Sequence, residues 1–179
     1  MSKYAEIIFA GVGGQGLVTI GTLLGEAAAL EGLNACLSST YGTEARGTFT
    51  KSDVIISGQQ IDFIEATSPD AVLCLAQAAY DRYSSCGAGG ALLLYDSDAV
   101  TPSGKAGWRG IEFSLSAIGA EGAANMAALG VAVAATGAVK EESVLEAIKI
   151  REASTQPLRK GSEEAFRKGF AAGKALASL

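Results

Sequence analysis

The segment Gly11–Gly16, which reads Gly-Val-Gly-Gly-Gln-Gly, constrains the fold more than any other part of the chain. It follows the apolar run Ile7–Ala10, and helix-forming residues without proline follow it over 17–30. A strand that ends in a glycine-rich turn and leads into a helix brings backbone N–H groups to an anion at the positive end of that helix. The predicted anion-facing turn consists of Gly11, Gly13, Gly14, Gln15 and Gly16.

The spacing of the glycines also fits the dinucleotide fingerprint, but the next strand argues against that interpretation. A dinucleotide site needs an acidic residue at the tip of the second strand, about 20 residues further on, to hold the ribose hydroxyls. The second strand is predicted at 34–38, and the first acid after it is Glu44, in a glycine-flanked loop. A Walker-type phosphate loop is excluded because no Gly-Lys-Ser/Thr follows the glycines. Two interpretations stay open: an anion site, or a turn that only lets helix and strand pack closely.

Strands and helices alternate along the sequence. A strand is expected at 48–57, whose polar first half suits an edge or one-sided position, and Ser143 with Glu146 forms a capping box that starts a helix. The full expectation is strands at 5–10, 34–38, 48–57, 61–64, 71–75, 91–95 and 111–115, and helices at 15–31, 76–85, 125–136, 143–152 and from 162 onward. This alternation predicts an α/β fold: a doubly wound, mostly parallel sheet with helices on both faces, in one Rossmann-like domain over 1–179.

Composition excludes several function classes. The net charge is −5 and the pI near 4.8, so nucleic acid is not expected as a partner. The sequence shows neither a signal peptide nor a run of 18 apolar residues free of glycine and charge, which predicts a cytoplasmic protein without a membrane span. Only 18% of the residues are charged. That low fraction indicates either a surface partly buried against other chains or a tightly packed monomer.

The chain is poorly equipped for catalysis. It contains no histidine, and its three cysteines, Cys36, Cys74 and Cys86, form no CxxC pair. A zinc site or a chain-borne iron–sulfur cluster is therefore not expected, and the usual general base is absent. No catalytic residue and no metal ligand is predicted in this chain.

Two motifs together are more specific than either alone. The second motif, Tyr41-Gly42-Thr43-Glu44-Ala45-Arg46-Gly47, begins 25 residues after the glycine turn. The pair resembles the gamma subunit of the 2-oxoacid:ferredoxin oxidoreductases, which carries a glycine-Gln-Gly turn and a Tyr-Gly-x-Glu-x-Arg-Gly loop. Segment 125–130, Asn-Met-Ala-Ala-Leu-Gly, is similar to the Asn-x-x-x-Leu-Gly helix of that family. The resemblance covers nearly the whole chain, with one departure: Thr48 stands where many relatives have a second glycine.

The resemblance implies a subunit of a complex that oxidatively decarboxylates a 2-oxoacid, joins the acyl group to coenzyme A and passes electrons to ferredoxin. It implies alpha, beta and ferredoxin-like delta subunits as partners. These would hold thiamine diphosphate, Mg²⁺ and the iron–sulfur clusters, leaving no cofactor in this chain and the isolated chain inactive. The second motif resembles the 2-oxoglutarate and branched-chain gamma subunits more than the pyruvate ones. Among the 2-oxoglutarate, pyruvate, 2-oxoisovalerate and indolepyruvate types, we favour the 2-oxoglutarate type.

The second motif supplies candidate interface or ligand residues: Tyr41, Gly42, Glu44, Arg46 and Gly47. Arg46 could bind a phosphate or carboxylate in bidentate fashion, and Glu44 could orient it or bond a neighbouring chain. The alternative is an internal contact that only shapes the interface. For Gln15, we expect the amide to cap the loop rather than to bind an anion. The competing function for the whole chain is a free-standing nucleotide- or phosphate-binding α/β domain.

Overall fold

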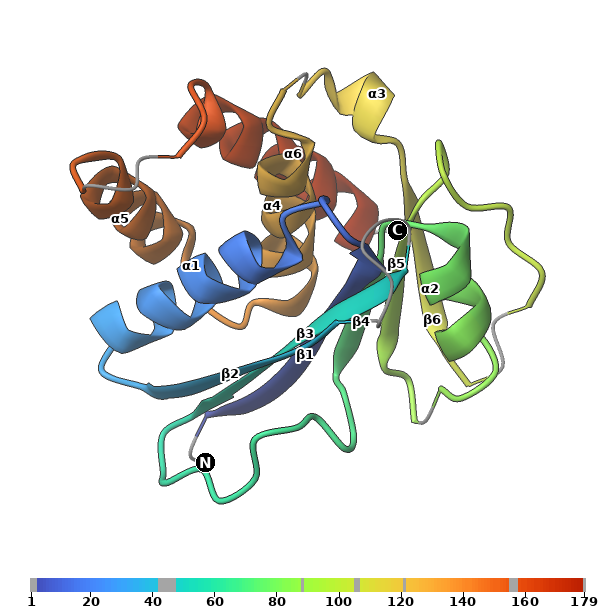
Figure 1. The fold of residues 1–179 in the computed structure, drawn as a ribbon, viewed down its shortest axis with the longest axis horizontal. Coiled ribbons are helices and arrows are strands. Elements are labelled where there is room, and N and C mark those ends of the chain that lie inside the picture. Colours follow the sequence, from blue (N-terminus) through green and yellow to red (C-terminus); the bar gives the residue numbers. More distant parts are fainter. Residues whose placement is uncertain are drawn as a thin grey trace.

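One mixed six-stranded sheet organises the chain. The computed structural model describes residues 3–41, 48–87, 89–104, 107–120, 122–154 and 158–178. The strand order is β2-β3-β1-β4-β5-β6 (Figure 1). β3 pairs antiparallel with β2 and β1, whereas β1, β4, β5 and β6 pair in parallel. The strands are β1 (Tyr4–Val12), β2 (Asn34–Tyr41), β3 (Phe49–Ser57), β4 (Ala71–Cys74), β5 (Leu92–Asp96) and β6 (Arg109–Phe113).

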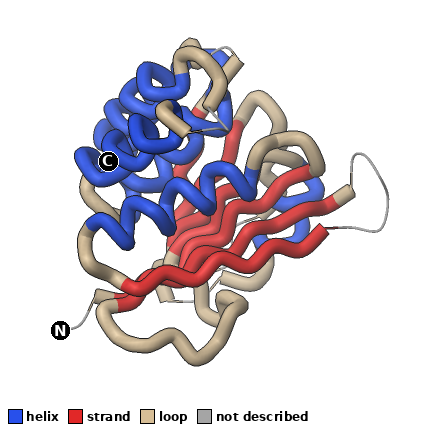
Figure 2. Tube along the Cα trace, turned by 60° about the vertical axis from the view of Figure 1, so that its left-hand side comes forward, coloured by secondary structure: helices blue, strands red, loops and turns tan. Residues whose placement is uncertain are grey.

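Helices cover both faces of this sheet. One face carries the larger core, with buried residues from α1, α4, α5 and α6, and Figure 2 shows this helical layer over the twisted strands. The opposite face carries a smaller core around α2, where Tyr80 packs against Tyr95. The doubly wound, mostly parallel α/β prediction is confirmed. The helices are α1 (Leu17–Leu30), α2 (Gln77–Tyr83), α3 (Leu115–Ile118), α4 (Ala124–Thr136), α5 (Glu141–Glu152) and α6 (Ser162–Ala177).

The polar strand β3 lies inside the sheet, between β2 and β1, so of the two positions expected for it the edge is wrong. Several of its polar side chains form pairs that the sequence does not reveal. The Ser52 hydroxyl lies 3.1 Å from that of Ser39 on β2, and Lys51 Nζ lies 2.7 Å from Asp53 Oδ2. Asp53 is fully buried, and its Oδ1 accepts no hydrogen bond from the described residues. Pairing of this kind makes an interior position tolerable for polar residues.

The return strand expected at 61–64 does not form. Segment 58–70 is irregular, and a buried carboxylate orders it instead of the sheet. Glu6 on β1 accepts hydrogen bonds from the backbone N–H groups of Thr67 and Ser68, each at 2.8 Å. Its other oxygen accepts from the Tyr4 hydroxyl at 2.6 Å, and this hydrogen bond is the main reason why the pKa of Tyr4 rises to about 12. Because a carboxylate is a strong hydrogen-bond acceptor, Glu6 satisfies the Thr67 and Ser68 N–H groups without a strand pairing.

Helix α5 begins two residues before the capping box expected at Ser143. The helix starts at Glu141, and Lys140 occupies the capping position without a side-chain cap. The backbone N–H of Lys140 instead donates to Glu31 Oε1, at the end of α1, at 2.5 Å. Glu31, at the end of another helix, therefore takes the place of the local cap expected from Ser143, and the capping-box prediction is wrong.

Glycines set the distance between α4 and α6. A Cβ added to Gly169 on α6 would collide with the Ala127 carbonyl oxygen on α4, and one added to Gly130 would collide with the Phe166 carbonyl oxygen. Gly173 meets the backbone of Val131 in the same way. The two backbones are therefore in direct contact, and this contact fixes where both helices begin. Within the described ranges, no helix is long and apolar enough to cross a bilayer.

Replacing Gly169 with alanine tests this packing. The new methyl group meets backbone rather than a movable side chain, so Gly169→Ala should lower the free energy of unfolding by about 3 kcal/mol. Urea denaturation measures the loss. The matched control is Gly104→Ala, whose added Cβ has no atom within 4 Å and should change stability by less than about 1 kcal/mol. Equal stability of the two variants would show that α4 and α6 can separate without cost.

Candidate functional site

A single glutamine amide holds the glycine turn in place. Gln15 Oε1 accepts a hydrogen bond from the backbone N–H of Val12, and Gln15 Nε2 donates to the carbonyl of Leu75, both at 2.8 Å. Val12 ends β1 and Leu75 follows β4, so the amide joins the ends of two neighbouring parallel strands. A Cβ at Gly11 would collide with Gln15 Oε1, so any other residue there would displace the amide. The amide therefore caps the loop.

Two further glycines give the turn its backbone shape. Gly14 and Gly16 have φ angles of 93° and 73°, in the left-handed region that side chains disfavour. Gly16 is the residue before α1, and the amide of Asn125 on α4 packs against its Cα so closely that a Cβ would collide with Asn125 Nδ2. The positive φ angles of its own glycines and the contact with Asn125 of α4 together set the shape of the turn.

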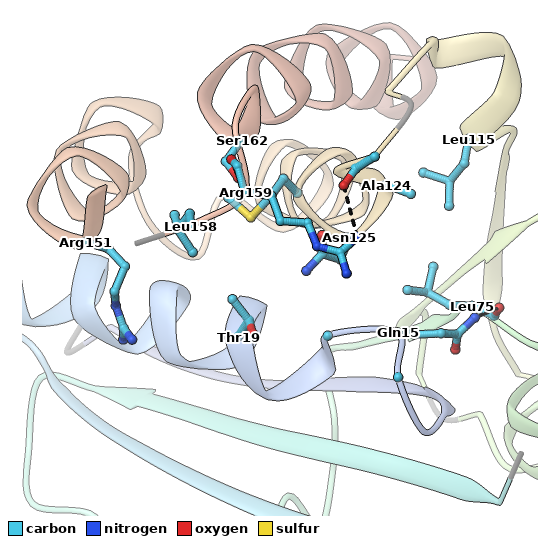
Figure 3. Close-up of a pocket in the computed structure, with 14 residues that line it drawn as sticks. Gln15, Thr19, Leu75, Leu115, Ala124, Asn125, Arg151, Leu158, Arg159 and Ser162 are labelled. Carbon is cyan, nitrogen blue, oxygen red and sulfur yellow. Dashed lines mark hydrogen bonds between the residues drawn. The ribbon is translucent and has the colours of Figure 1, made fainter. Parts of the chain in front are cut away.

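The turn borders a cavity of about 570 Å³ at the carboxyl ends of β1 and β4 (Figure 3). From β1 the chain crosses through α1 to the β2 side of the sheet, whereas β4, β5 and β6 extend on the other side. Ligands of α/β sheets bind at such a switch point. The lining residues are Gly14, Gln15, Gly16, Thr19, Leu75, Leu115, Gly122, Ala124, Asn125, Met126, Arg151, Leu158, Arg159 and Ser162.

Four helices begin at this cavity: the one-turn helix α3, which the Ser114 side chain caps, and the three longer helices α1, α4 and α6. The first residues of α4 and α6 line it, as does Gly16 directly before α1. None of these three helix starts has a side-chain hydrogen bond as a cap, and Ser162 instead donates its hydroxyl hydrogen to the Arg159 carbonyl at 2.7 Å. Helix starts carry partial positive charge from unpaired backbone N–H groups. The cavity is therefore electrostatically suited to an anion.

Two arginines in the cavity differ in their partners. Arg151 on α5 lies 2.5 Å from the carboxylate of Glu26 on α1, which neutralises it. Arg159, three residues before the first residue of α6, is exposed and donates to the Gly122 carbonyl at 3.3 Å. Figure 3 shows the Arg159 guanidinium reaching over Asn125 toward the turn. Of the two arginines in the described lining, Arg159 is thus the one that can bind a ligand.

The described lining can bind but lacks a group that could carry out acid–base chemistry. It contains no Asp, Glu, His, Lys or Cys. Cys74, next to Leu75, is buried, and burial raises the pKa of its thiol to about 12, so it is not a thiolate nucleophile at neutral pH. Across the ranges that the structure describes, no three His, Cys, Asp or Glu side chains gather in a way that could hold a metal ion.

Comparison with known proteins assigns the chain to a family. The model of the family described as pyruvate ferredoxin/flavodoxin oxidoreductase matches residues 6–172. The chain belongs to the pyruvate ferredoxin/flavodoxin oxidoreductase family. Among curated relatives, it is similar to 2-oxoglutarate synthase subunit KorC of Methanocaldococcus jannaschii, with 37% identity over 96% of this chain and 95% of that protein. It is also similar to ketoisovalerate oxidoreductase subunit VorA of Methanothermobacter thermautotrophicus, with 36% identity over 80% of this chain but 31% of the relative.

Solved structures agree with this assignment. The gamma subunit of a keto/oxoacid ferredoxin oxidoreductase from Geobacter sulfurreducens superimposes with a TM-score of 0.76 and 36% identity, covering 98% of this chain and 97% of that one. A 2-oxoglutarate:ferredoxin oxidoreductase from Magnetococcus marinus, whose structure has 2-oxoglutarate, coenzyme A and succinyl-CoA bound, shares the fold at a TM-score of 0.76 and 22% identity. This chain covers 31% of that longer chain. The resemblance to the gamma subunits is confirmed.

The predicted residues of this family member fall into three groups. Gly14, Gln15 and Gly16 line the cavity, whereas Gly11 is buried at the strand end and Gly13 is exposed, with its N–H donating to the Thr48 carbonyl. The loop residues Gly42, Glu44, Arg46 and Gly47 lie outside the described residues, as does the Tyr41 side chain.

Sequence reasoning missed the arginines of the cavity. Arg159 had the appearance of a solvated position on the terminal helix, because Lys160 follows it. Its position three residues before a predicted helix could have indicated the site, since the starts of helices in such folds can lie at the same edge of the sheet as the glycine turn.

Replacing Gln15 with alanine tests the bridge between β1 and β4. The change leaves the Val12 N–H and the Leu75 carbonyl without their partner, so the free energy of unfolding should fall by about 1–3 kcal/mol. Urea denaturation gives the value. In the control Gln60→Ala, the exposed amide loses only its 3.2 Å bond to exposed Asp62, and stability should stay within about 0.5 kcal/mol of wild type. A Gln15 variant as stable as that control would contradict the role assigned to the amide.

Proposed function

We propose that the chain is the gamma-type subunit of a 2-oxoacid:ferredoxin oxidoreductase of the 2-oxoglutarate type. One observation carries the proposal: the similarity to KorC extends over nearly the full length of both chains. The VorA relative is similarly identical but matches over less than a third of its own length. A chain that corresponds to a complete KorC subunit fits the 2-oxoglutarate type better than the 2-oxoisovalerate type.

In this proposal the chain is part of an enzyme but holds none of its redox groups. The whole complex would decarboxylate 2-oxoglutarate oxidatively, transfer the acyl group to coenzyme A and reduce ferredoxin. Thiamine diphosphate, Mg²⁺ and iron–sulfur clusters would belong to alpha, beta and ferredoxin-like delta subunits. The described residues of this chain support such a division, since the cavity lining lacks a base and the described acids and cysteines form no metal cluster.

The role we propose for the cavity is to receive the acidic groups of coenzyme A. Its phosphates match a site formed by three helix starts and the guanidinium of Arg159. The glycine turn would then bring backbone N–H groups close to a phosphate, as the sequence pattern predicts. The fold neighbour from Magnetococcus marinus has coenzyme A bound, which supports this choice of ligand.

We further propose that residues 1–179 form one gamma-type domain and that the loop Tyr41–Gly47 faces the partner subunits. In that position Arg46 would grip a carboxylate or phosphate, or Glu44 would bond a neighbouring chain. The alternative function, a free-standing nucleotide- or phosphate-binding domain, would use the same cavity. Thermal shift with NAD or FAD separates the two: a cognate nucleotide at a hundredfold excess over its dissociation constant stabilises a free-standing binder by about 2.7 kcal/mol, whereas neither should stabilise a gamma subunit that binds coenzyme A.

Native purification of the tagged chain from its own cells tests the function. We expect partner subunits that contain iron–sulfur clusters and thiamine diphosphate to co-purify. With coenzyme A and a viologen dye, the preparation should be most active on 2-oxoglutarate among a panel of 2-oxoacids. Preference for 2-oxoisovalerate would overturn the substrate but not the class. Recovery of the chain alone, with no activity and with stabilisation by a nucleotide, would establish the alternative.

Changing Arg159 to alanine tests the coenzyme A site in the purified complex. Loss of one charge-assisted contact costs about 1.5–3 kcal/mol, so the KM for coenzyme A should rise by at least about tenfold. The KM for 2-oxoglutarate should stay the same, because its pocket is proposed to lie in other subunits. Arg167→Ala is the matched control, since Arg167 pairs only with Glu163 on the exposed side of α6. If both variants leave the KM for coenzyme A unchanged, the cavity does not bind it.

A further inference from the structure

One edge of the sheet is long and carries no charge. β2 ends the strand order, so within the described residues no strand pairs with its outer side. Its eight residues, Asn34–Tyr41, include no charged residue and no proline, and each pairs in turn with β3 from Ser57 to Thr50 without a bulge. Charges, proline, bulges and shortness are the devices that keep natural edge strands from pairing with other chains. β2 has none of them.

The opposite edge of the same sheet provides an internal comparison. β6 has five residues, and two of them, Arg109 and Glu112, are exposed and charged. Arg109 also donates to the Ala177 carbonyl at the end of α6. The short edge is therefore protected against strand pairing while the long edge is open to it.

The surface next to β2 carries few charges. Figure 1 shows α1 lying above β2, and two glycines bring the helix down onto it: Gly25 approaches Ala35, and Gly21 approaches Leu37. The helical repeat puts further small α1 side chains on the same flank, together with Glu26, whose charge is paired with Arg151 of α5, and Leu37 is 37% exposed beside them. The small residues of this flank are Val18, Thr22 and Ala29.

We propose that β2 pairs antiparallel with β2 of a second copy of this chain, around a two-fold axis at Leu37. A two-fold axis perpendicular to the sheet keeps each side chain on its own face, so residues that oppose each other must differ by an even number in the sequence. An axis at Leu37 satisfies this condition, aligns Ala35 with Ser39 of the second copy and uses the strand from Asn34 to Thr40. It also buries Leu37 against its own counterpart.

Two properties of this edge favour a second copy of the chain as the partner that pairs with β2. An edge without charge can pair with itself without placing like charges opposite one another, the arrangement that destabilises cross-strand pairs. Helix α1 contacts both β2 and β3, and strands in a sheet lie about 4.8 Å apart, so the two α1 helices would lie about 10 Å or a little more from each other. Small residues on the facing flanks suit helices at that distance. The pairing would join two six-stranded sheets into one.

Sedimentation equilibrium of the purified full-length chain tests the dimer. Wild type should dimerise, and Leu37→Lys should weaken association by about tenfold or more, because two like charges would meet at the axis. Leu30→Lys is the matched control: Leu30 is 50% exposed at the end of α1, and the helical repeat places it on a different side of the helix from Val18, Thr22 and Ala29, so its variant should associate like wild type. A wild type that stays monomeric at every concentration, or equal association of all three chains, would overturn the proposal.

Cysteine trapping tests the register without relying on a disruptive change. In a Cys36→Ser, Cys86→Ser background, Leu37→Cys should form a disulfide-linked dimer under mild oxidation. Directly opposed Cα atoms in an antiparallel pair lie about 4.5–5.5 Å apart, within disulfide reach. Ala35→Cys should not link, since its two copies would lie about 13 Å apart along the strands. Linking at position 35 but not at 37, or at neither, would overturn the axis. Both tests need no substrate, so they are independent of the proposed function.

Discussion

The bridge made by Gln15 is the interaction on which the site depends. Its amide satisfies the Val12 N–H and the Leu75 carbonyl at once, which locks the ends of two adjacent parallel strands at the switch point of the sheet. With the amide in place, the turn can adopt left-handed glycine conformations and still hold α1 at a fixed angle. Every other element of the cavity is placed relative to that turn.

The second constraint lies outside the glycine turn, in the contact between α4 and α6. Gly130 and Gly169 let the two backbones touch, so the starts of both helices arrive at the same place. The Asn-x-x-x-Leu-Gly segment contacts three parts of the fold: the glycine turn, the core and α6. Asn125 packs on the glycine turn, Leu129 is fully buried in the core, and Gly130 receives α6. The small residues of this segment are therefore a requirement of its geometry.

Sequence patterns correctly predicted the features that depend on neighbouring residues alone. The apolar runs at 71–75 and 91–95 gave their strands, and the spacing of the glycines gave the turn at Gly14–Gly16, because backbone preferences decide both. Tertiary partners decided the rest. The interior place of β3 rests on the Lys51–Asp53 and Ser39–Ser52 pairs, and the path of segment 58–70 rests on Glu6. Arg159 joined the site only because α6 is docked against α4, a relation between segments that no spacing in the sequence expresses.

The charge balance of the cavity narrows the ligand it suits. The Glu26 carboxylate cancels Arg151, whereas the structure pairs Arg159 with the carbonyl of Gly122, which carries no full charge. Each helix start adds about half a positive charge, so three of them and one guanidinium amount to roughly two and a half charges. A monocarboxylate would leave much of that field unbalanced, whereas a group with two or more negative charges, such as a diphosphate, would balance it. This charge balance supports the proposal that the cavity receives a phosphorylated carrier and not a simple carboxylic acid.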